Sequence, residues 1–334
     1  MTPLVHHRHS FFDLCLKDKI TVAGIPYWVE SEAQGGMGCI LLLRQDSNYI
    51  PSKLSNIGFK VALKAVLPNI ADKDGIALFR RELTVWAGFQ HPNIVRLLDI
   101  LDGGDAGWVA AMDWCGGSLR DILDEHKILT PRDSTYIISN LISGLDYAYA
   151  KDQVLHLDLK PENVLYDFNL MGANSPENSL FRYRFMVSDW GIASIKQKEL
   201  NAIAGVPPTA ATAQQTFNNM GTILYMAPER FRQRFSSSLA SDVFSLGFIY
   251  LEMLVGNLPF RNGTHPAKTI QSGQYLVDAE NLLRTHKIQK SDAEVILSMI
   301  AFSPTDRPSS YSSLSKEILK AWRKSNGFFS KPFN

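Results

Sequence analysis

Two kinds of hydrophobic patterning follow one another along the chain, short extended runs first and helical periodicity afterwards. Five runs in the first third are rich in β-branched and apolar residues, as strands are: Ile20–Glu30, Cys39–Arg44, Phe59–Val66, Val95–Leu101 and Trp108–Asp113. Between the third and fourth runs, apolar residues recur at helical spacing and stop at Gly88: Ile76, Phe79, Leu83 and Trp86. The pattern predicts a strand-rich region that contains one helix.

Helical patterning dominates after the Gly116-Gly117 pair. Ser118, with Asp121 three residues later, predicts a capped helix start. Thr130-Pro131 predicts a second start, with proline at the first helical position. Five apolar residues then share one face of that helix: Ile138, Leu141, Ile142, Leu145 and Ala148. Asp242–Val255 is apolar nearly all round, which predicts a helix buried in the middle of its lobe.

The order of these patterns predicts an α+β fold with two lobes. The small β-rich N-lobe is expected at about 20–112, a hinge at 113–117, and a larger, mainly helical C-lobe at 118–325. The remaining residues form an N-terminal arm at 1–19 and a C-terminal tail at 326–334.

Composition narrows the class of protein. The chain has 334 residues, 45% hydrophobic and 20% charged, which excludes a disordered chain, a collagen and a coiled coil. A net charge of +1 gives no support to a nucleic-acid partner. The spacing of Cys15, Cys39 and Cys115 fits neither a zinc site nor a disulfide framework, so a reducing, cytoplasmic location is expected. The most apolar window, Val243–Val255, is too short to span a bilayer, so no membrane partner is expected. No pattern indicates an oligomeric state.

A glycine-rich run lies between two predicted strands, with the sequence Ala33-Gln34-Gly35-Gly36-Met37-Gly38-Cys39-Ile40. Glycines let backbone N–H groups approach phosphate oxygens closely. A plain β-hairpin turn would account for the run equally well, and both interpretations stay open.

A lysine lies inside an apolar strand, in the run Val61-Ala62-Leu63-Lys64. Burying its ammonium is costly unless the charge is paired. Glu82, in the helix that follows, is a candidate partner that could hold the ammonium toward bound phosphates. The alternative is an edge-strand lysine whose ammonium reaches water.

The strongest chemical signal is the stretch His156–Leu165, where polar and apolar residues alternate at intervals that suit neither a helix nor a strand. It therefore predicts a shaped loop. Asp158 can accept a hydroxyl proton, Lys160 can neutralise a phosphate, and Asn163 can offer an oxygen to a metal ion. Further along, Asp189 lies at a predicted strand end in Val187-Ser188-Asp189-Trp190-Gly191, and Met226-Ala227-Pro228-Glu229 follows.

Taken in this order, the motifs resemble those of a eukaryotic-type (Hanks-type) serine/threonine protein kinase over about residues 20–325. Three further runs match the family: His91-Pro92-Asn93-Ile94-Val95, Ser241–Gly247 and Asp306-Arg307-Pro308. The resemblance implies the two-lobed protein kinase fold and a pairing of Arg307 with Glu229. The Gly-Gly-Met-Gly form of the glycine run is similar to bacterial members.

The resemblance also implies ATP and Mg²⁺, or Mn²⁺ in its place, as cofactors and Ser/Thr-bearing proteins as substrates. It makes Asp158 the catalytic base, aided by Lys160, Asn163 and Thr222, and makes Asn163 and Asp189 metal ligands. Lys64 would bind the α/β-phosphates and pair with Glu82. The other residues implied to contact the nucleotide are Ala33, Gln34, Gly35, Gly36, Met37, Gly38, Ile40, Ala62, Met112, Asp113, Cys115 and Leu165.

The chain departs from the family pattern at several positions. Ala33 replaces the first glycine, Trp190 replaces Phe of D-F-G, and Leu157 replaces Arg of H-R-D. That Arg normally receives a phosphate on the activation segment, so the segment is expected to become ordered without one at that position. The interval from Asn163 to Asp189 is longer than the family's, and the extra residues around 167–181 are expected to form an enlarged hairpin loop.

A stretch rich in Ala, Thr and Gln, Ala204–Asn219, reads as a loop. Its threonines are either phosphorylation sites or solvated loop residues: Thr209, Thr212 and Thr216.

Three functions remain in competition. The first is a serine/threonine protein kinase that also phosphorylates itself. The second is a pseudokinase-like binding scaffold, against which the retention of Lys64, Asp158, Asn163 and Asp189 argues. The third is a small-molecule kinase of the antibiotic-phosphotransferase kind, which lacks the Gly221-Thr222 and Ala227-Pro228-Glu229 segment present here.

Overall fold

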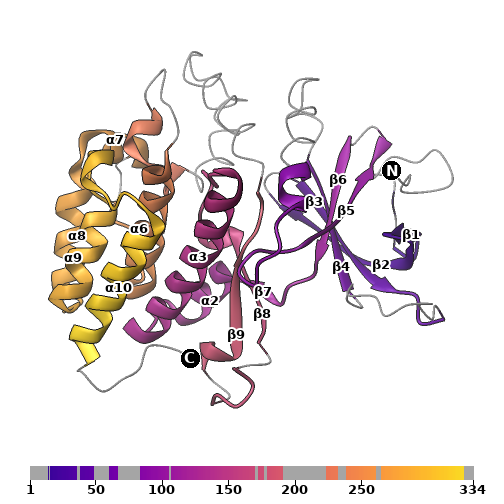
Figure 1. The fold of residues 1–334 in the computed structure, drawn as a ribbon, viewed down its shortest axis with the longest axis horizontal. Coiled ribbons are helices and arrows are strands. Elements are labelled where there is room, and N and C mark those ends of the chain that lie inside the picture. Colours follow the sequence, from indigo (N-terminus) through magenta and orange to yellow (C-terminus); the bar gives the residue numbers. More distant parts are fainter. Residues whose placement is uncertain are drawn as a thin grey trace. The chain divides into compact units, whose positions relative to one another are not determined.

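The structure, a computed structural model of the chain (Figure 1), describes residues 14, 16–35, 38–48, 60–66, 83–104, 107–169, 172–176, 179–190, 223–231, 238–260 and 265–326. The chain divides into two compact units. The first contains the described residues up to Cys115 together with Asp189 and Trp190. The second contains Gly116–Ser188 and the described residues from Ile223 onward.

A six-stranded antiparallel sheet forms the body of the first unit, in the order β1-β2-β3-β4-β6-β5. Its strands are β1 (Lys19–Val22), β2 (Ile25–Gly35), β3 (Gly38–Gln45), β4 (Lys60–Val66), β5 (Leu97–Asp102) and β6 (Trp108–Asp113). Alternate residues of each strand share a face of the sheet, and one core cluster includes Tyr27, Leu43, Val61 and Leu63. The prediction of a strand-rich first region is confirmed.

The prediction of one strand over Ile20–Glu30 is wrong, because the chain reverses at Ala23-Gly24 to separate β1 from β2. Both turn residues have a positive φ, 47° and 81°, as a type I′ hairpin turn requires. Alanine rarely adopts that conformation, so the apolar run concealed the turn. Of the predicted helix that ends at Gly88, residues 83–87 are helical, and its start lies outside the described residues.

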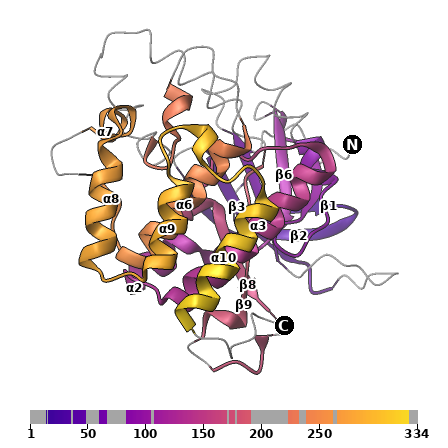
Figure 2. The ribbon, with the colours of Figure 1, turned by 60° about the vertical axis from the view of Figure 1, so that its left-hand side comes forward.

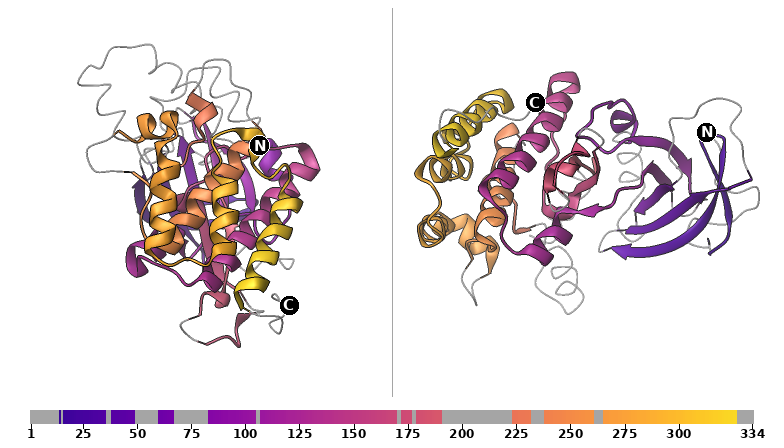
Figure 3. Two further views of the ribbon diagram at one scale, coloured as in Figure 1. Left: turned by 90° about the vertical axis from the view of Figure 1, so that its left-hand side faces the viewer. Right: turned by 90° about the horizontal axis from the view of Figure 1, so that it is seen from below.

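Helices and a small sheet form the second unit (Figure 2, Figure 3). The helices are α2 (Leu119–His126), α3 (Pro131–Asp152), α6 (Leu239–Val255), α7 (Pro266–Ser272), α8 (Gln274–Thr285), α9 (Lys290–Met299) and α10 (Tyr311–Asn326). The strands are β7 (Gly117–Ser118), β8 (Val164–Phe168) and β9 (Tyr183–Val187). Among the described residues of the unit are also four short 3₁₀ turns: η4 (Pro161–Asn163), η6 (Leu180–Arg182), η7 (Pro228–Phe231) and η8 (Pro304–Asp306).

Helix α6 is the centre of this unit, as its all-round apolar sequence predicted. Every residue of α6 except Ala240 is buried, and the helix contacts α3, α8 and α9. Helix α10 packs against α9 and α3. The polar side chains Asp242 and Glu252 of α6 are therefore buried and need partners from neighbouring segments.

Both predicted helix starts are confirmed. Ser118 and Asp121 form a reciprocal capping box at α2, and the Thr130 hydroxyl accepts a hydrogen bond from the Asp133 amide, at 3.1 Å, at α3. The five apolar residues predicted to share a face of α3 are all buried.

Replacing Thr130 with Ala should lower the free energy of unfolding of the full chain by about 1 kcal/mol, since an N-terminal amide of α3 loses its side-chain acceptor. Urea-induced unfolding followed by far-UV circular dichroism measures the loss. The control is Thr130→Ser, which keeps the hydroxyl and should stay within about half of that loss. Equal stability of the wild type and the alanine variant would contradict the prediction.

The expected enlarged hairpin between Asn163 and Asp189 is confirmed. Strands β8 and β9 pair from Val164 with Val187 to Phe168 with Tyr183. The hairpin is fixed to α3 through Tyr136, whose hydroxyl donates to the Tyr183 carbonyl at 2.9 Å and whose ring lies 4.5 Å from that of Phe181.

Candidate active site

Asp242 of α6 fixes the backbone of the loop between α3 and β8. The backbone amides of His156 and Leu157 donate to the two Asp242 carboxylate oxygens at 2.7 and 2.6 Å. The Tyr311 hydroxyl of α10 also donates to this carboxylate, at 3.2 Å. Asp242 is fully buried, and burial raises the pKa of its carboxyl, while nearby His156 and the two amides act in the opposite direction. These contacts fix Leu157 in a left-handed conformation with φ of 60°.

Three predicted site residues converge in this loop. The Asn163 amide nitrogen donates to both the carbonyl oxygen and a carboxylate oxygen of Asp158, each at 2.8 Å. The Lys160 ammonium lies 3.7 Å from the Asp158 carboxylate. The 3₁₀ turn η4 brings Asn163 back toward Asp158. In this turn the backbone N–H of Asn163 donates to the Lys160 carbonyl at 2.9 Å. The loop therefore presents a carboxylate, an ammonium and an amide together.

The donor set of Asn163 bears on metal binding. Its amide nitrogen is directed at Asp158, so its amide oxygen is the atom left to accept or ligate. Amide and carboxylate oxygens are ligands that Mg²⁺ prefers. Asn163 and Asp189 each carry a side-chain oxygen of this kind.

In the first unit, Lys64 of β4 forms an ion pair with Asp189. Asp189 has a φ of 61°, and the next residue, Trp190, is buried with its ring edge-on to Phe89 at 5.1 Å. Sequence reasoning gave Lys64 a different partner, Glu82, which lies outside the described residues. It missed the pairing with Asp189, because no local pattern connects residues so far apart in the chain.

The remaining predicted nucleotide residues of the first unit lie on strands or just after them. Ala62 and Met112 are both buried and face each other across β4 and β6. Ile40 of β3 is the cross-strand neighbour of Lys64. Asp113 binds the Arg96 guanidinium at 2.9 and 3.1 Å, a salt bridge that sequence reasoning missed. Cys115 is buried.

The glycine run forms the end of β2 and the start of β3, with Gly35 opposite Gly38. The backbone of Ala33 and Gln34 lies in β2. Gly36 and Met37 lie outside the described residues, as do Thr222 and the three threonines Thr209, Thr212 and Thr216. Leu165, of the second unit, lies on β8 opposite Ser118.

The predicted pairing of Arg307 with Glu229 is confirmed. Two guanidinium nitrogens meet the two carboxylate oxygens at 2.8 and 2.9 Å, and the Arg307 side chain is fully buried. The Ser241 hydroxyl also donates to Glu229, at 3.0 Å. This paired geometry is the strong form of a charge-assisted hydrogen bond.

A second ionic cluster, unnoticed in the sequence, surrounds Arg120 of α2. Its guanidinium contacts Glu252 of α6 at 2.9 Å, Glu162 of η4 at 3.0 Å and the Tyr225 hydroxyl at 2.7 Å. The Tyr225 hydroxyl donates in turn to Glu252. Burial and the Glu252 charge raise the pKa of Tyr225 well above its usual value. The glutamate inside buried α6 was the one available sequence signal.

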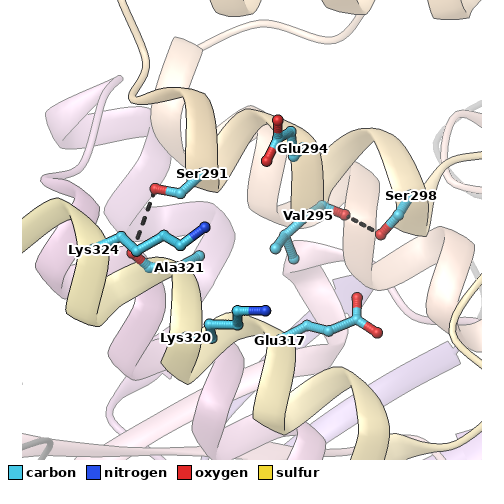
Figure 4. A pocket seen from close by; sticks show the side chains of 8 residues that line it. All are labelled: Ser291, Glu294, Val295, Ser298, Glu317, Lys320, Ala321 and Lys324. Atoms are coloured by element: carbon cyan, nitrogen blue, oxygen red, sulfur yellow. Dashed lines mark hydrogen bonds between the residues drawn. The ribbon is translucent and has the colours of Figure 1, made fainter.

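A pocket lies between α9 and α10 (Figure 4). Its lining residues are Ser291, Glu294, Val295, Ser298, Glu317, Lys320, Ala321 and Lys324. None of them is among the predicted site residues.

Comparison with known proteins gives these features a family. The family "Protein kinase domain" matches residues 52–320, and the chain therefore belongs to the protein kinase family. The crystal structure of Rad53 1–466 in complex with AMP-PNP is similar, with a TM-score of 0.61 and 22% identity over 90% of this chain and 65% of that one. The predicted α+β protein kinase fold is confirmed.

Among curated relatives, the serine/threonine-protein kinase PkaB of Streptomyces coelicolor is 31% identical over 63% of this chain and 46% of its own length. PrkC of Bacillus subtilis, also a serine/threonine-protein kinase, is 27% identical over 60% of this chain and 27% of its own. The dual specificity protein kinase splA of Dictyostelium discoideum is 29% identical over 60% and 8%. The alignments thus span less than half of these relatives. Within the described residues, no helix has the length and apolar character needed to cross a membrane.

Proposed function

We propose that this protein is a serine/threonine protein kinase, which transfers the γ-phosphoryl group of Mg-ATP to Ser/Thr hydroxyls of proteins, its own included. The observation that carries the proposal is the convergence of Lys160 and Asn163 on the Asp158 carboxylate. Kinship with bacterial serine/threonine-protein kinases supports it. A net charge of +1 gives no support to a nucleic-acid partner. The spacing of the three cysteines supports a cytoplasmic location, and the short length of the apolar window Val243–Val255 argues against a membrane partner.

In this proposal Asp158 accepts the proton of the substrate hydroxyl. At the same time the hydroxyl oxygen forms a bond to the γ-phosphorus of ATP, and the bond from the γ-phosphorus to the leaving ADP breaks. Asn163 holds the Asp158 carboxylate in one orientation by its hydrogen bond of 2.8 Å. Lys160, 3.7 Å from that carboxylate, offers its charge to the transferred phosphoryl group. Thr222 is proposed to assist Lys160.

Asn163 and Asp189 are the proposed ligands of Mg²⁺ or Mn²⁺, which neutralises charge on the β- and γ-phosphates when bound. Lys64, held by Asp189, is the proposed contact of the α/β-phosphates, with Glu82 as a further partner. The glycine run and Ile40, Ala62, Met112 and Leu165 are proposed to line the nucleotide site. The backbone at Asp113–Cys115, within the proposed hinge 113–117, would meet the adenine.

Asp189→Ala should abolish most of the thermal stabilisation that Mg-ATP gives, and Lys64→Ala should reduce it. A ligand that binds the folded state stabilises it by about 2.7 kcal/mol at a concentration of a hundred times Kd. A variant that has lost a proposed contact to Mg-ATP binds it more weakly and therefore gains less of this stabilisation. Differential scanning fluorimetry with and without Mg-ATP measures the shift.

The controls for this shift are Lys19→Ala and Asp46→Ala, which break a 2.9 Å ion pair between β1 and the residue that follows β3. Both should keep the Mg-ATP shift. An unchanged shift in Asp189→Ala and Lys64→Ala would place the nucleotide site elsewhere.

Incubating the pure chain with γ-labelled ATP and Mg²⁺ tests the function itself. Label on the chain or on a generic basic protein supports the protein kinase. Binding of Mg-ATP without any transfer would identify a scaffold, and transfer to an aminoglycoside but to neither protein would identify a small-molecule kinase.

A further inference from the structure

Arg230, directly after Glu229 in η7, is a buried arginine that the proposed mechanism does not use. Its side chain lies in the second unit, and only 6% of the residue is exposed. A guanidinium keeps its charge at all ordinary pH values, so burying it is costly unless nearby groups compensate. The position of Arg230 therefore calls for a physical reason.

The guanidinium of Arg230 donates a hydrogen bond to the carbonyl oxygen of Leu157. Burial lowers the pKa of Arg230, and three carboxylates oppose that effect, with Asp242 the strongest, then Asp158 and Glu229. Arg230 thus faces the peptide unit that leads directly into Asp158.

Glu229 is not the group that fixes Arg230 in place. Its two carboxylate oxygens already accept from Arg307 at 2.8 and 2.9 Å, and one also accepts from Ser241 at 3.0 Å. The Arg307–Glu229 pair is satisfied by itself. The hydrogen bond of Arg230 goes to the Leu157 carbonyl, and Asp242 and Asp158 are the two carboxylates that favour its charge most.

Leu157 is held on both sides by charged groups. Its amide donates to Asp242 at 2.6 Å, and its carbonyl accepts from Arg230. Its φ of 60° is unfavourable for a leucine and persists only where the surroundings determine it. Its own side chain brings no charge, although two buried carboxylates, those of Asp158 and Asp242, lie close by. The Lys160 ammonium lies 3.7 Å from Asp158, and Arg230 is a cation from another segment whose charge both carboxylates favour.

We infer that Arg230 is a positioning residue for the catalytic base: it fixes the carbonyl of Leu157 and so sets the direction in which Asp158 leaves the loop. The inference rests on the proposed kinase function. Through the Arg230 side chain, the residue that follows the Ala227-Pro228-Glu229 segment is linked to the catalytic base Asp158. This link requires no phosphate.

Three substitutions of the full-length protein separate charge, hydrogen bonding and bulk. Arg230→Lys keeps the charge and a donor, Arg230→Gln keeps only a donor, and Arg230→Leu keeps neither. The matched control is Tyr275→Phe on α8. It likewise removes one buried hydrogen bond from a side chain to a backbone carbonyl, here the 2.8 Å bond from the Tyr275 hydroxyl to Ile300. If Arg230→Leu does not fold, the comparison of Lys with Gln carries the test.

Steady-state phosphorylation of a protein substrate is the first readout. Arg230→Leu should lower kcat at least tenfold with KM for ATP within twofold, Arg230→Lys should stay within threefold of wild type, and Arg230→Gln should fall between them. Tyr275→Phe should leave kcat unchanged. An unchanged kcat in Arg230→Leu, a loss confined to KM for ATP, or equal kcat values for Lys and Gln would overturn the inference.

Hydrogen–deuterium exchange is the second readout, and it does not require activity. Amide exchange in peptides covering 154–163 should rise at least fivefold in Arg230→Leu or Arg230→Gln, and stay at the wild-type rate in Arg230→Lys and Tyr275→Phe. Unchanged exchange in the first two variants overturns the inference. If the wild type transfers no phosphate at all, the proposed function fails, and exchange alone decides whether Arg230 holds the loop.

Discussion

Replacing Asp158 with Asn should lower the rate of phosphoryl transfer by about 10²–10⁴-fold, the usual contribution of a general base. The substitution keeps the size and shape of the side chain, and the amide oxygen of an asparagine can still accept the Asn163 hydrogen bond of 2.8 Å. What disappears is the capacity to take up the hydroxyl proton. Binding of Mg-ATP should persist, because Lys64 and Asp189 are untouched. Single-turnover transfer of labelled phosphate, with Mg-ATP binding measured separately, checks both expectations.

The control for this experiment is Asp152→Asn, the same chemical change at an exposed residue near the end of α3. It should transfer phosphate at the wild-type rate. Near-normal transfer by Asp158→Asn would remove Asp158 from the proposed mechanism. A loss of transfer accompanied by a loss of folding would show instead that the buried carboxylate is structural.

Replacing Arg307 with Leu should lower the free energy of unfolding by about 3–5 kcal/mol, the cost of leaving one member of a buried ion pair without its partner. The Glu229 carboxylate is only 5% exposed, and Ser241 is the side-chain donor that would remain to it among the described residues. Carbonyl oxygens at Ala240 and Ala301, which Arg307 contacts at 2.8 and 2.7 Å, would lose a donor as well. Equilibrium unfolding in urea measures the difference.

The double variant Glu229→Leu, Arg307→Leu separates the pair from its desolvation. In the double variant no unpaired carboxylate remains buried at this site. The double variant should therefore be more stable than Arg307→Leu alone. If Arg307→Leu costs less than about 1 kcal/mol, the pair contributes no more than an exposed salt bridge does.

Much of the fold follows from local sequence rules. Ser118 with Asp121, and Thr130 with Pro131, mark helix starts because capping depends on a few neighbouring residues. The buried position of α6 follows from its apolar sequence. The one clear strand error fell at Ala23-Gly24, where a residue that rarely tolerates positive φ forms the turn.

The candidate site divides in the same way. Asp158, Lys160 and Asn163 share one short segment, so the sequence was able to group them. The contacts of Lys64 with Asp189, Arg120 with Glu252, and Arg230 with Leu157 join residues separated by 73 or more positions. Only the packing of the chain brings such residues together. The sequence signals of these contacts are weak: a polar residue inside an apolar helix, such as Glu252, or a cation next to a motif, such as Arg230.

Helix α10 bears on how short a working fragment of this protein can be. The Tyr311 hydroxyl at its start donates to Asp242, the same carboxylate that receives the amides of His156 and Leu157. A recombinant fragment that ends before Tyr311 would leave the Asp242 carboxylate one donor short at full burial, and would uncover the faces of α3 and α9. The smallest active fragment should therefore include α10, although every motif named for catalysis lies upstream of it.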